Sequence, residues 1–178
     1  MKIKRIFSLL LALLIFSMTL AGCSSGGGAG SFSANTLDGG TFTQKDIADK
    51  DLTVINFWGT FCSPCIAEMP DLADFEKALP DSVQLITICV DASGNENTAK
   101  ALLDAAGYEG VTLVSGNESF NELTKNIQAV PTTIFIDSDG KQVGEEIIGM
   151  QPDLAGAYLS AINKALNDIG KAEISLEV

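Results

Sequence analysis

The sequence predicts one α/β domain, built as a mixed central β-sheet with helices on both faces. At 178 residues and 46% hydrophobic content, the chain is long enough to bury a sizeable core. Short apolar runs rich in β-branched residues alternate with helical patterns, which is typical of strands joined by helices. Towards the end, two strands about the turn at residues 137–140 predict a closing hairpin, and one more helix follows.

Residues 1–22 are typical of an export signal. Lys2, Lys4 and Arg5 supply its charged part, and residues 6–20 form an apolar run broken only by three hydroxyl side chains. That run is a little short for a comfortable transmembrane span. We therefore expect these residues to direct export.

The end of this leader, Leu20-Ala21-Gly22-Cys23, resembles the lipobox of bacterial lipoproteins in all four positions. The resemblance implies cleavage before Cys23 and attachment of a diacylglyceryl group to its sulfur. The alternative is an uncleaved anchor in which the cysteine is incidental. Both alternatives place the domain outside the cytoplasm and tether it to a bacterial membrane.

A flexible linker is expected at residues 23–31, where Gly and Ser dominate and no side chain can build a core. The folded domain is expected over residues 32–178. It begins at residues 32–47 with two short strands about a turn at 37–40, followed by the start of a turn at Asp46 and Ile47.

The segment that organises the chain is the strand predicted at residues 52–57 and the cysteine pair after it. Cys62 and Cys65 open a helix expected at about 64–79, with Pro64 in its first turn, where a missing N–H does no harm. The unpaired N–H groups and the positive end of a helix stabilise a thiolate on the first cysteine. With two residues between them, the second cysteine can reach back and close a disulfide. Half of a zinc site is the alternative, but the chain has no histidine to help complete four ligands.

The remaining elements follow from periodicity and from Gly and Pro positions. Pro70 is expected to kink the helix because it removes one backbone hydrogen bond. We expect a strand at 83–90, a helix at 97–106, a strand at 111–114, a helix at 119–127, a hairpin of 134–136 with 143–148, and a helix at 152–169. The last helix carries one apolar stripe, made of Leu154, Tyr158, Ile162, Leu166 and Ile169. The tail at 171–178 is left open, as a strand or as loose chain.

Composition excludes several classes of function. Without the three basic residues of the leader, eight lysines and no arginine face 23 acidic residues, a net charge of about −15, which argues against nucleic-acid binding. The absence of histidine rules out Ser-His-Asp and Cys-His catalysis and weakens metal delivery, so no metal site is expected.

Two motifs carry a resemblance to a known family. Residues 57–65, read as Phe-Trp-Gly-Thr-Phe-Cys-Ser-Pro-Cys and followed by Glu68-Met69-Pro70, resemble the thioredoxin superfamily. The match is to its membrane-tethered TlpA/ResA-like thiol–disulfide oxidoreductases. Residues 130–136 look like the family's cis-proline segment, and the inserted strand and helix within 83–114 suit this branch. The resemblance covers about residues 32–170 and implies a thioredoxin fold.

The resemblance also implies the roles of the site residues. Cys62 would be the exposed nucleophile that attacks a partner disulfide, and Cys65 would resolve the mixed disulfide. Val130 and Pro131, with the proline in cis, would present the backbone to an extended substrate segment. Trp58 would flank the site and shape its docking surface, a role compatible with ordinary core packing.

Glu68 is expected to handle protons. Thioredoxins place a buried Asp where this chain has Asn56, which cannot take up a proton, and the TlpA/ResA-like branch resembles this chain in having a Glu three residues beyond the second cysteine. A carboxylate there would relay a proton to or from Cys65 and raise the thiol pKa values. A solvated helix residue is the alternative. Cys89, in an apolar strand, is expected to be a small buried hydrophobe, with a regulatory or second redox role as the alternative.

The resulting hypothesis is an extracytoplasmic thiol–disulfide oxidoreductase that reduces disulfides in exported proteins, such as apocytochrome c or repair enzymes. A membrane thiol donor of the cytochrome-biogenesis type would re-reduce it, and no cofactor is expected. One alternative is a non-catalytic binding lipoprotein on the same scaffold. The other is a peroxiredoxin-like peroxidase, which expects a Thr at the place of Gly59 and an Arg that the mature chain lacks.

Overall fold

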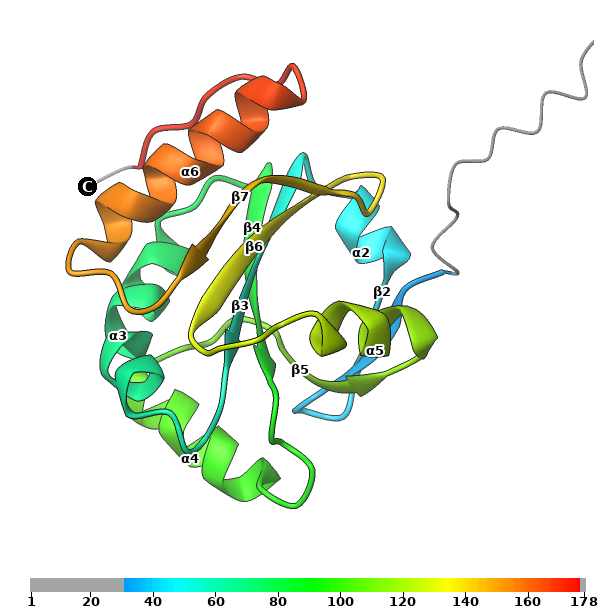
Figure 1. Ribbon diagram of the computed structural model, residues 1–178, viewed down its shortest axis with the longest axis vertical. Helices are drawn as coiled ribbons and strands as arrows, with labels where there is room; N and C mark the ends of the chain where they lie inside the picture. Colours follow the sequence, from blue (N-terminus) through cyan, green and yellow to red (C-terminus); the bar gives the residue numbers. More distant parts are fainter. Residues whose placement is uncertain (1–30, 177–178) are drawn as a thin grey trace, which may run out of the picture.

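The computed structural model describes residues 31–176, which form one seven-stranded mixed sheet between two layers of helices (Figure 1). The predicted signal, the predicted lipidation site Cys23 and nearly all of the predicted linker lie outside the described residues. The order of the strands across the sheet is β2-β1-β5-β4-β3-β6-β7. Both β4 and β5 continue the sheet in parallel from β3, whereas β6 and β7 add to its other side as antiparallel strands. The predicted α/β class, and the thioredoxin fold implied by resemblance, are confirmed.

The strands at the centre of the sheet are nearly continuous apolar runs, because helices cover both of their faces. All seven residues of β3 are buried. The strand bounds are β1 Ser33–Thr36, β2 Thr41–Thr43, β3 Leu52–Trp58, β4 Val83–Cys89, β5 Thr112–Gly116, β6 Thr132–Asp137 and β7 Gln142–Ile148.

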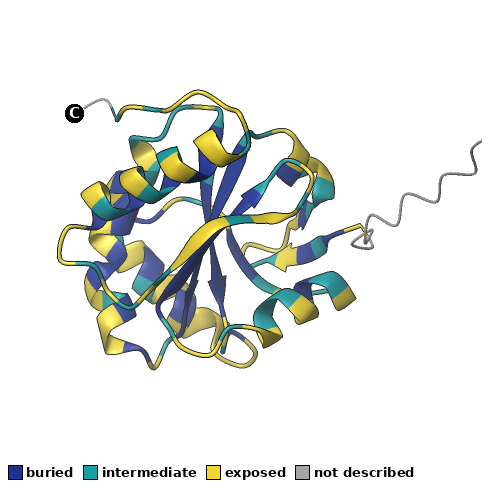
Figure 2. Ribbon diagram, turned by 45° about the horizontal axis from the view of Figure 1, so that its top comes forward, coloured by how far each residue is buried: buried dark blue, intermediate teal, exposed yellow. Residues whose placement is uncertain are grey.

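The helices divide between the two faces of the sheet, as Figure 1 shows. The helix bounds are α2 Gln44–Ala48, α3 Ser63–Lys77, α4 Glu96–Ala106, α5 Glu118–Lys125 and α6 Leu154–Asp168. One core lies under α3, α4 and α6 and includes Leu72, Leu103 and Ile162. The other lies under α2 and α5 and includes Ile47 and Phe120. Buried residues follow the strands through the middle of the molecule, and exposed residues cover the outer sides of the helices (Figure 2).

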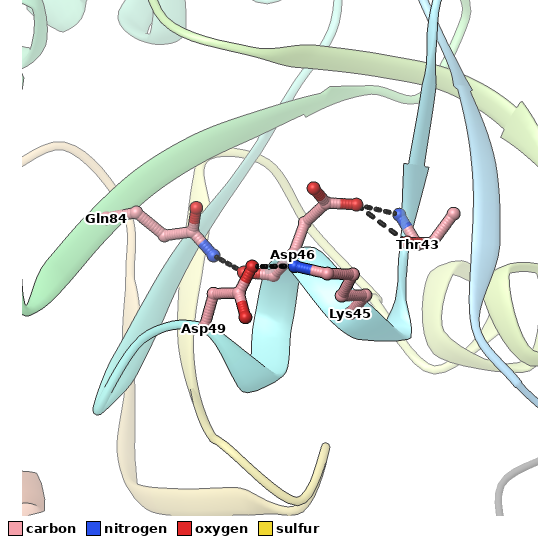
Figure 3. Close-up of polar contacts among 5 residues, drawn as sticks. All are labelled: Thr43, Lys45, Asp46, Asp49 and Gln84. Atoms are coloured by element: carbon pink, nitrogen blue, oxygen red, sulfur yellow. Dashed lines mark hydrogen bonds and ion pairs between the residues drawn. The ribbon is translucent and has the colours of Figure 1, made fainter.

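Short polar contacts fix α2 against the sheet (Figure 3). The backbone N–H and the hydroxyl of Thr43 both donate to the Asp46 carboxylate, each at 2.7 Å, so the first turn of the helix is capped. Lys45 pairs with Asp49 along the exposed side of the helix. From β4, the side-chain amide of Gln84 donates to the Asp46 carbonyl oxygen at 2.9 Å, which joins helix and sheet.

Most expected elements occur within a few residues of their predicted bounds. The active-site helix α3 runs through Pro70 as one helix, so the expected kink does not divide it. The tail, which the sequence left open, is not a strand up to residue 176. It returns along α6, where the amide of Asn163 bonds both the carbonyl and the N–H of Ile174. Within residues 31–176, no helix is long and apolar enough to cross a membrane.

Candidate active site

The cysteine pair lies where β3 ends and α3 begins. Cys62 is the N-cap of α3, in an extended conformation, and Pro64 lies in the first turn as predicted. The Cys62 sulfur accepts a hydrogen bond from the backbone N–H of Cys65 at 3.2 Å. No acidic side chain lies in this first turn, so no carboxylate of that turn opposes the action of the positive end of the helix on the sulfur. The two cysteines form a disulfide.

The exposure of Cys62 differs from the expectation. Only 5% of the residue is exposed, and Cys65 is 1% exposed. The prediction of an exposed nucleophile was therefore too simple, because neighbouring loops cover most of the residue. A partner must approach along a narrow direction to reach this sulfur.

One of those loops is the Val130–Pro131 segment. The Val130–Pro131 peptide bond is cis, and Pro131 is buried. The Val130 carbonyl oxygen lies 3.6 Å from the Cys62 sulfur. The Pro131 carbonyl in turn accepts from the backbone N–H of Gly149 at 2.8 Å, which ties the segment to the end of β7. The half-buried Val130 and its carbonyl oxygen thus border the disulfide.

A second contact fixes the loop between β3 and α3. Asp91, just beyond β4, accepts from the backbone N–H of Thr60 at 2.8 Å and from its hydroxyl at 2.5 Å. Because both carboxylate oxygens are used, the loop that carries the cysteines is held to the end of the neighbouring strand.

Beneath the disulfide lies a closed cluster of four polar side chains, which we call the polar cluster: Asn56, Glu68, Thr133 and Tyr158. They come from β3, α3, β6 and α6, and none is more than 4% exposed. The Asn56 amide nitrogen lies 3.4 Å from Glu68 Oε1, 3.1 Å from the Thr133 hydroxyl and 3.2 Å from the Tyr158 hydroxyl. The two hydroxyls lie 2.6 Å apart.

Glu68 is the only carboxyl group in the polar cluster, and the alternative of a solvated helix residue is excluded by its burial. Its second oxygen, Oε2, is buried and makes no hydrogen bond. Burial raises the pKa of Glu68, while the Asn56 amide and the backbone of Gln151 oppose the shift and Asp71 adds to it. Such a group changes its protonation state closer to neutral pH than an ordinary glutamate does.

Trp58 is fully buried, at 0% exposure, and its indole N–H has no hydrogen-bond partner. Its ring can therefore shape the docking surface only indirectly, from within the core. The exposed aromatic ring at the site is Phe61, which is 67% exposed and directly precedes Cys62.

A groove of about 890 Å³ opens beside the disulfide on the α5 side of the sheet. Phe61 and Val90 form one side of it, α5 and residues 127–130 the other, and no carboxylate lines it. Its lining includes Phe61, Val90, Phe120, Thr124, Lys125 and Val130. On the far side of Pro131, the exposed side chains of Ile148 and Met150 extend the apolar surface.

Cys89 is the free cysteine of the described residues. It is 2% exposed, and its sulfur lies 3.4 Å from Asp91 Oδ1. Burial, with the hydrogen bond to Asp91, raises the pKa of its thiol to about 12. These facts favour the expected role as a small buried hydrophobe.

The sequence pointed to Glu68 but not to Thr133 and Tyr158, which are the other partners of Asn56, nor to the groove along α5. Tyr158 was assigned to the apolar stripe of α6. A hydroxyl at a core position needs a hydrogen-bond partner, and this was the available signal that the stripe contained a polar contact.

Comparison with known proteins agrees with this geometry. A family model described as Redoxin matches residues 25–158. Thiol-disulfide oxidoreductase ResA of Bacillus thuringiensis (strain Al Hakam) is 33% identical over 125 residues, which make up 69% of this chain and 69% of that protein.

Two solved structures share the fold. The pneumococcal exposed lipoprotein thioredoxin Etrx1 of Streptococcus pneumoniae strain TIGR4 is 25% identical with a TM-score of 0.59, covering 78% of this chain and 98% of that one. StoA from Bacillus subtilis is 26% identical with a TM-score of 0.55, covering 68% and 89%.

Proposed function

Because the chain belongs to the Redoxin family and is a thiol–disulfide oxidoreductase, we propose that it works outside the cytoplasm and reduces disulfides in exported proteins. The observation that carries the proposal is the Cys62–Cys65 disulfide at the start of α3, 3.6 Å from the Val130 carbonyl oxygen. The clients would be apocytochrome c or repair enzymes. Lipid attachment at Cys23 would hold the domain at the membrane.

The exchange begins with the reduced pair. The Cys62 thiolate attacks one sulfur of a client disulfide, the client S–S bond breaks, and the other client sulfur leaves as a thiolate that takes a proton. The Cys65 sulfur then attacks Cys62 in the mixed disulfide and releases the second client thiol. The client gains two electrons and two protons, and the Cys62–Cys65 disulfide forms.

Proton transfer in the second step falls to Glu68. Cys65 must lose its proton before it attacks, and Glu68 lies one turn further along the same helix, with one oxygen unpaired. The raised pKa of Glu68 suits a carboxylate that accepts this proton and later returns it. A membrane thiol donor of the cytochrome-biogenesis type would then re-reduce the pair.

Client polypeptide would lie across the Val130–Pro131 segment, with an apolar side chain in the groove beside Phe61. A mixed disulfide at Cys62 necessarily brings the client backbone next to the Val130–Pro131 segment. The groove supports the assignment because Lys125 is the only charged residue that lines it, in a chain with 23 acidic residues.

The direction of exchange is tested by the midpoint potential of the Cys62–Cys65 couple, equilibrated against glutathione or dithiothreitol. A value near or below about −250 mV is expected for a reductase. A value near about −120 mV would make the protein an oxidant that introduces disulfides, and the proposed direction would be wrong.

A further inference from the structure

The Asn56 amide has more acceptors than hydrogen atoms. Its nitrogen carries two, yet it faces Glu68 Oε1, the Thr133 hydroxyl and the Tyr158 hydroxyl. In the structure the amide nitrogen faces this group, and this atom is the one that can bond Glu68 in its ionised form, because an ionised carboxylate can only accept. Three full hydrogen bonds cannot form at once, so the acceptors compete.

The distances show which acceptors are favoured. The contacts to Thr133 and Tyr158, at 3.1 and 3.2 Å, are of ordinary length, and the contact to Glu68, at 3.4 Å, is long. The two hydroxyls therefore hold the amide away from the carboxyl group.

Both hydroxyls are fixed in place. They bond each other at 2.6 Å, and the Tyr158 ring packs edge-on against Phe75 with centroids 5.5 Å apart. Tyr158 is 2% and Thr133 1% exposed, so neither hydroxyl can exchange its partner for water. Because the two competing hydroxyls are fixed in place, the strength of the hydrogen bond that Asn56 can give to Glu68 is fixed as well.

We propose that Tyr158, together with Thr133, is a positioning residue that competes with Glu68 for the amide protons of Asn56 and so sets how tightly Glu68 holds its proton. The functional meaning of this inference rests on the proposed role of Glu68 in exchange. The competition itself does not depend on that role.

The groups that act on Glu68 are few, and the backbone of Gln151, which favours the ionised form, is one of them. On its own helix the charged neighbour is Asp71, and from α6 the titratable neighbour is Tyr158, whose pKa is raised to about 12 and which therefore stays neutral. The polar side chains from β3 and β6, Asn56 and Thr133, do not ionise. In the oxidised protein the two cysteines do not titrate either, so this form gives the cleanest test.

The experiment follows the carboxyl ¹³C shift of Glu68 with pH in the oxidised full domain, with Glu68→Gln identifying the signal. Tyr158→Phe and Thr133→Val each remove a competitor, free the amide for the carboxylate and lower the midpoint, by roughly 0.5 to 1 pH unit. Asn56→Leu removes the hydrogen-bond donor and should raise the midpoint of the Glu68 titration. If these side chains had only a structural role, their variants would not shift the Glu68 midpoint in opposite directions.

The matched control is Tyr108→Phe. Tyr108 is also buried, at 5% exposure, and its hydroxyl bonds the Leu85 carbonyl, away from Glu68. This variant should leave the Glu68 midpoint unchanged. The proposal is overturned if Tyr158→Phe and Thr133→Val both leave the midpoint in place or raise it, or if Tyr108→Phe shifts it equally.

Failure of the proposed function looks different. If Glu68→Gln leaves the pH profile of disulfide exchange unchanged, Glu68 has no part in exchange. The ¹³C titration still decides the hydrogen-bond competition in that case.

Discussion

The two sides of the Cys62–Cys65 disulfide differ in polarity and in access. On the side of α3 and α6 lies the polar cluster, with four side chains that are at most 4% exposed. On the α5 side lies the groove, which is open, mainly apolar and bordered by Phe61 at 67% exposure. Because the disulfide follows the carboxyl end of β3, an interior strand of the sheet, it can be reached from both faces, and each face can have a different role. A closed polar site controls protons, and an open apolar surface suits a partner chain.

The largest expected effect comes from removing the thiol of Cys62, whose disulfide lies between the polar cluster and the groove. Cys62→Ser should slow the reduction of insulin disulfides by at least about 1000-fold, because within residues 31–176 no other exposed thiol can start the exchange. Cys65→Ser should instead trap a mixed disulfide with the client.

Cys89→Ser is the matched control for this loss. The buried Cys89 thiol has its pKa raised to about 12, so its removal should leave the rate unchanged. A large loss in this variant would contradict the assignment of Cys89 to the core.

Glu68→Gln tests the closed side. If the carboxylate takes the Cys65 proton, exchange at pH 7 should slow by about 100-fold and the pH dependence from Glu68 should disappear. Stopped-flow measurement of client release from the mixed disulfide reports this step.

Glu76→Gln is the control on the same helix. Glu76 is half-buried, and burial raises its pKa as well, but it lies about two turns further from the cysteines than Glu68 does. Equal pH profiles for the two variants would show that the effect belongs to the helix and not to the polar cluster.

Thr124→Trp tests the open side by filling the groove. The rate with a peptide disulfide that carries a large apolar side chain next to its cysteine should fall by about 10-fold, the loss of one well-packed contact. The rate with the small disulfide of oxidised dithiothreitol should stay the same. Glu122→Trp, on α5 but outside the groove, is the control. Equal losses with both disulfides would contradict docking in the groove.

The smallest expected effect is on stability. Because the folded pKa of Glu68 lies above its ordinary value, folding favours the neutral acid and ionisation destabilises the fold as pH rises through that pKa. Glu68→Gln should therefore raise the melting temperature at pH 8 by about 2 to 4 °C. At pH 4, where the acid is largely neutral, the gain should vanish. Thermal unfolding followed by circular dichroism measures both values.

The two sides also differ in how far the sequence predicts them. The cysteine pair and its helix could be placed because local signals suffice: an apolar strand, Pro64 in the first turn and a spacing that allows a disulfide. Val130 and Pro131 were predicted through resemblance, and in the structure the Val130 carbonyl oxygen lies 3.6 Å from the Cys62 sulfur.

The polar cluster could be predicted only in part. Asn56 and Glu68 stand out because they depart from the thioredoxin pattern, yet their partners lie 77 and 102 residues beyond Asn56. Which hydroxyls meet Asn56 depends on the antiparallel register of β3 with β6 and on the rotation of α6, and single-sequence periodicity specifies neither. The groove depends on the gap between four separate segments of the chain, so no local sequence pattern indicates it.

The position of Tyr158 on the last helix has a consequence for how the protein is made. The ribosome completes Cys62 and Cys65 well before α6, so a nascent chain presents both thiols before the polar cluster can close around Glu68. The same holds for a chain truncated before α6, which would keep its cysteines without their controlled proton partner. Glu68 therefore has its complete set of polar neighbours only once α6 has docked on the sheet and brought Tyr158 to Asn56.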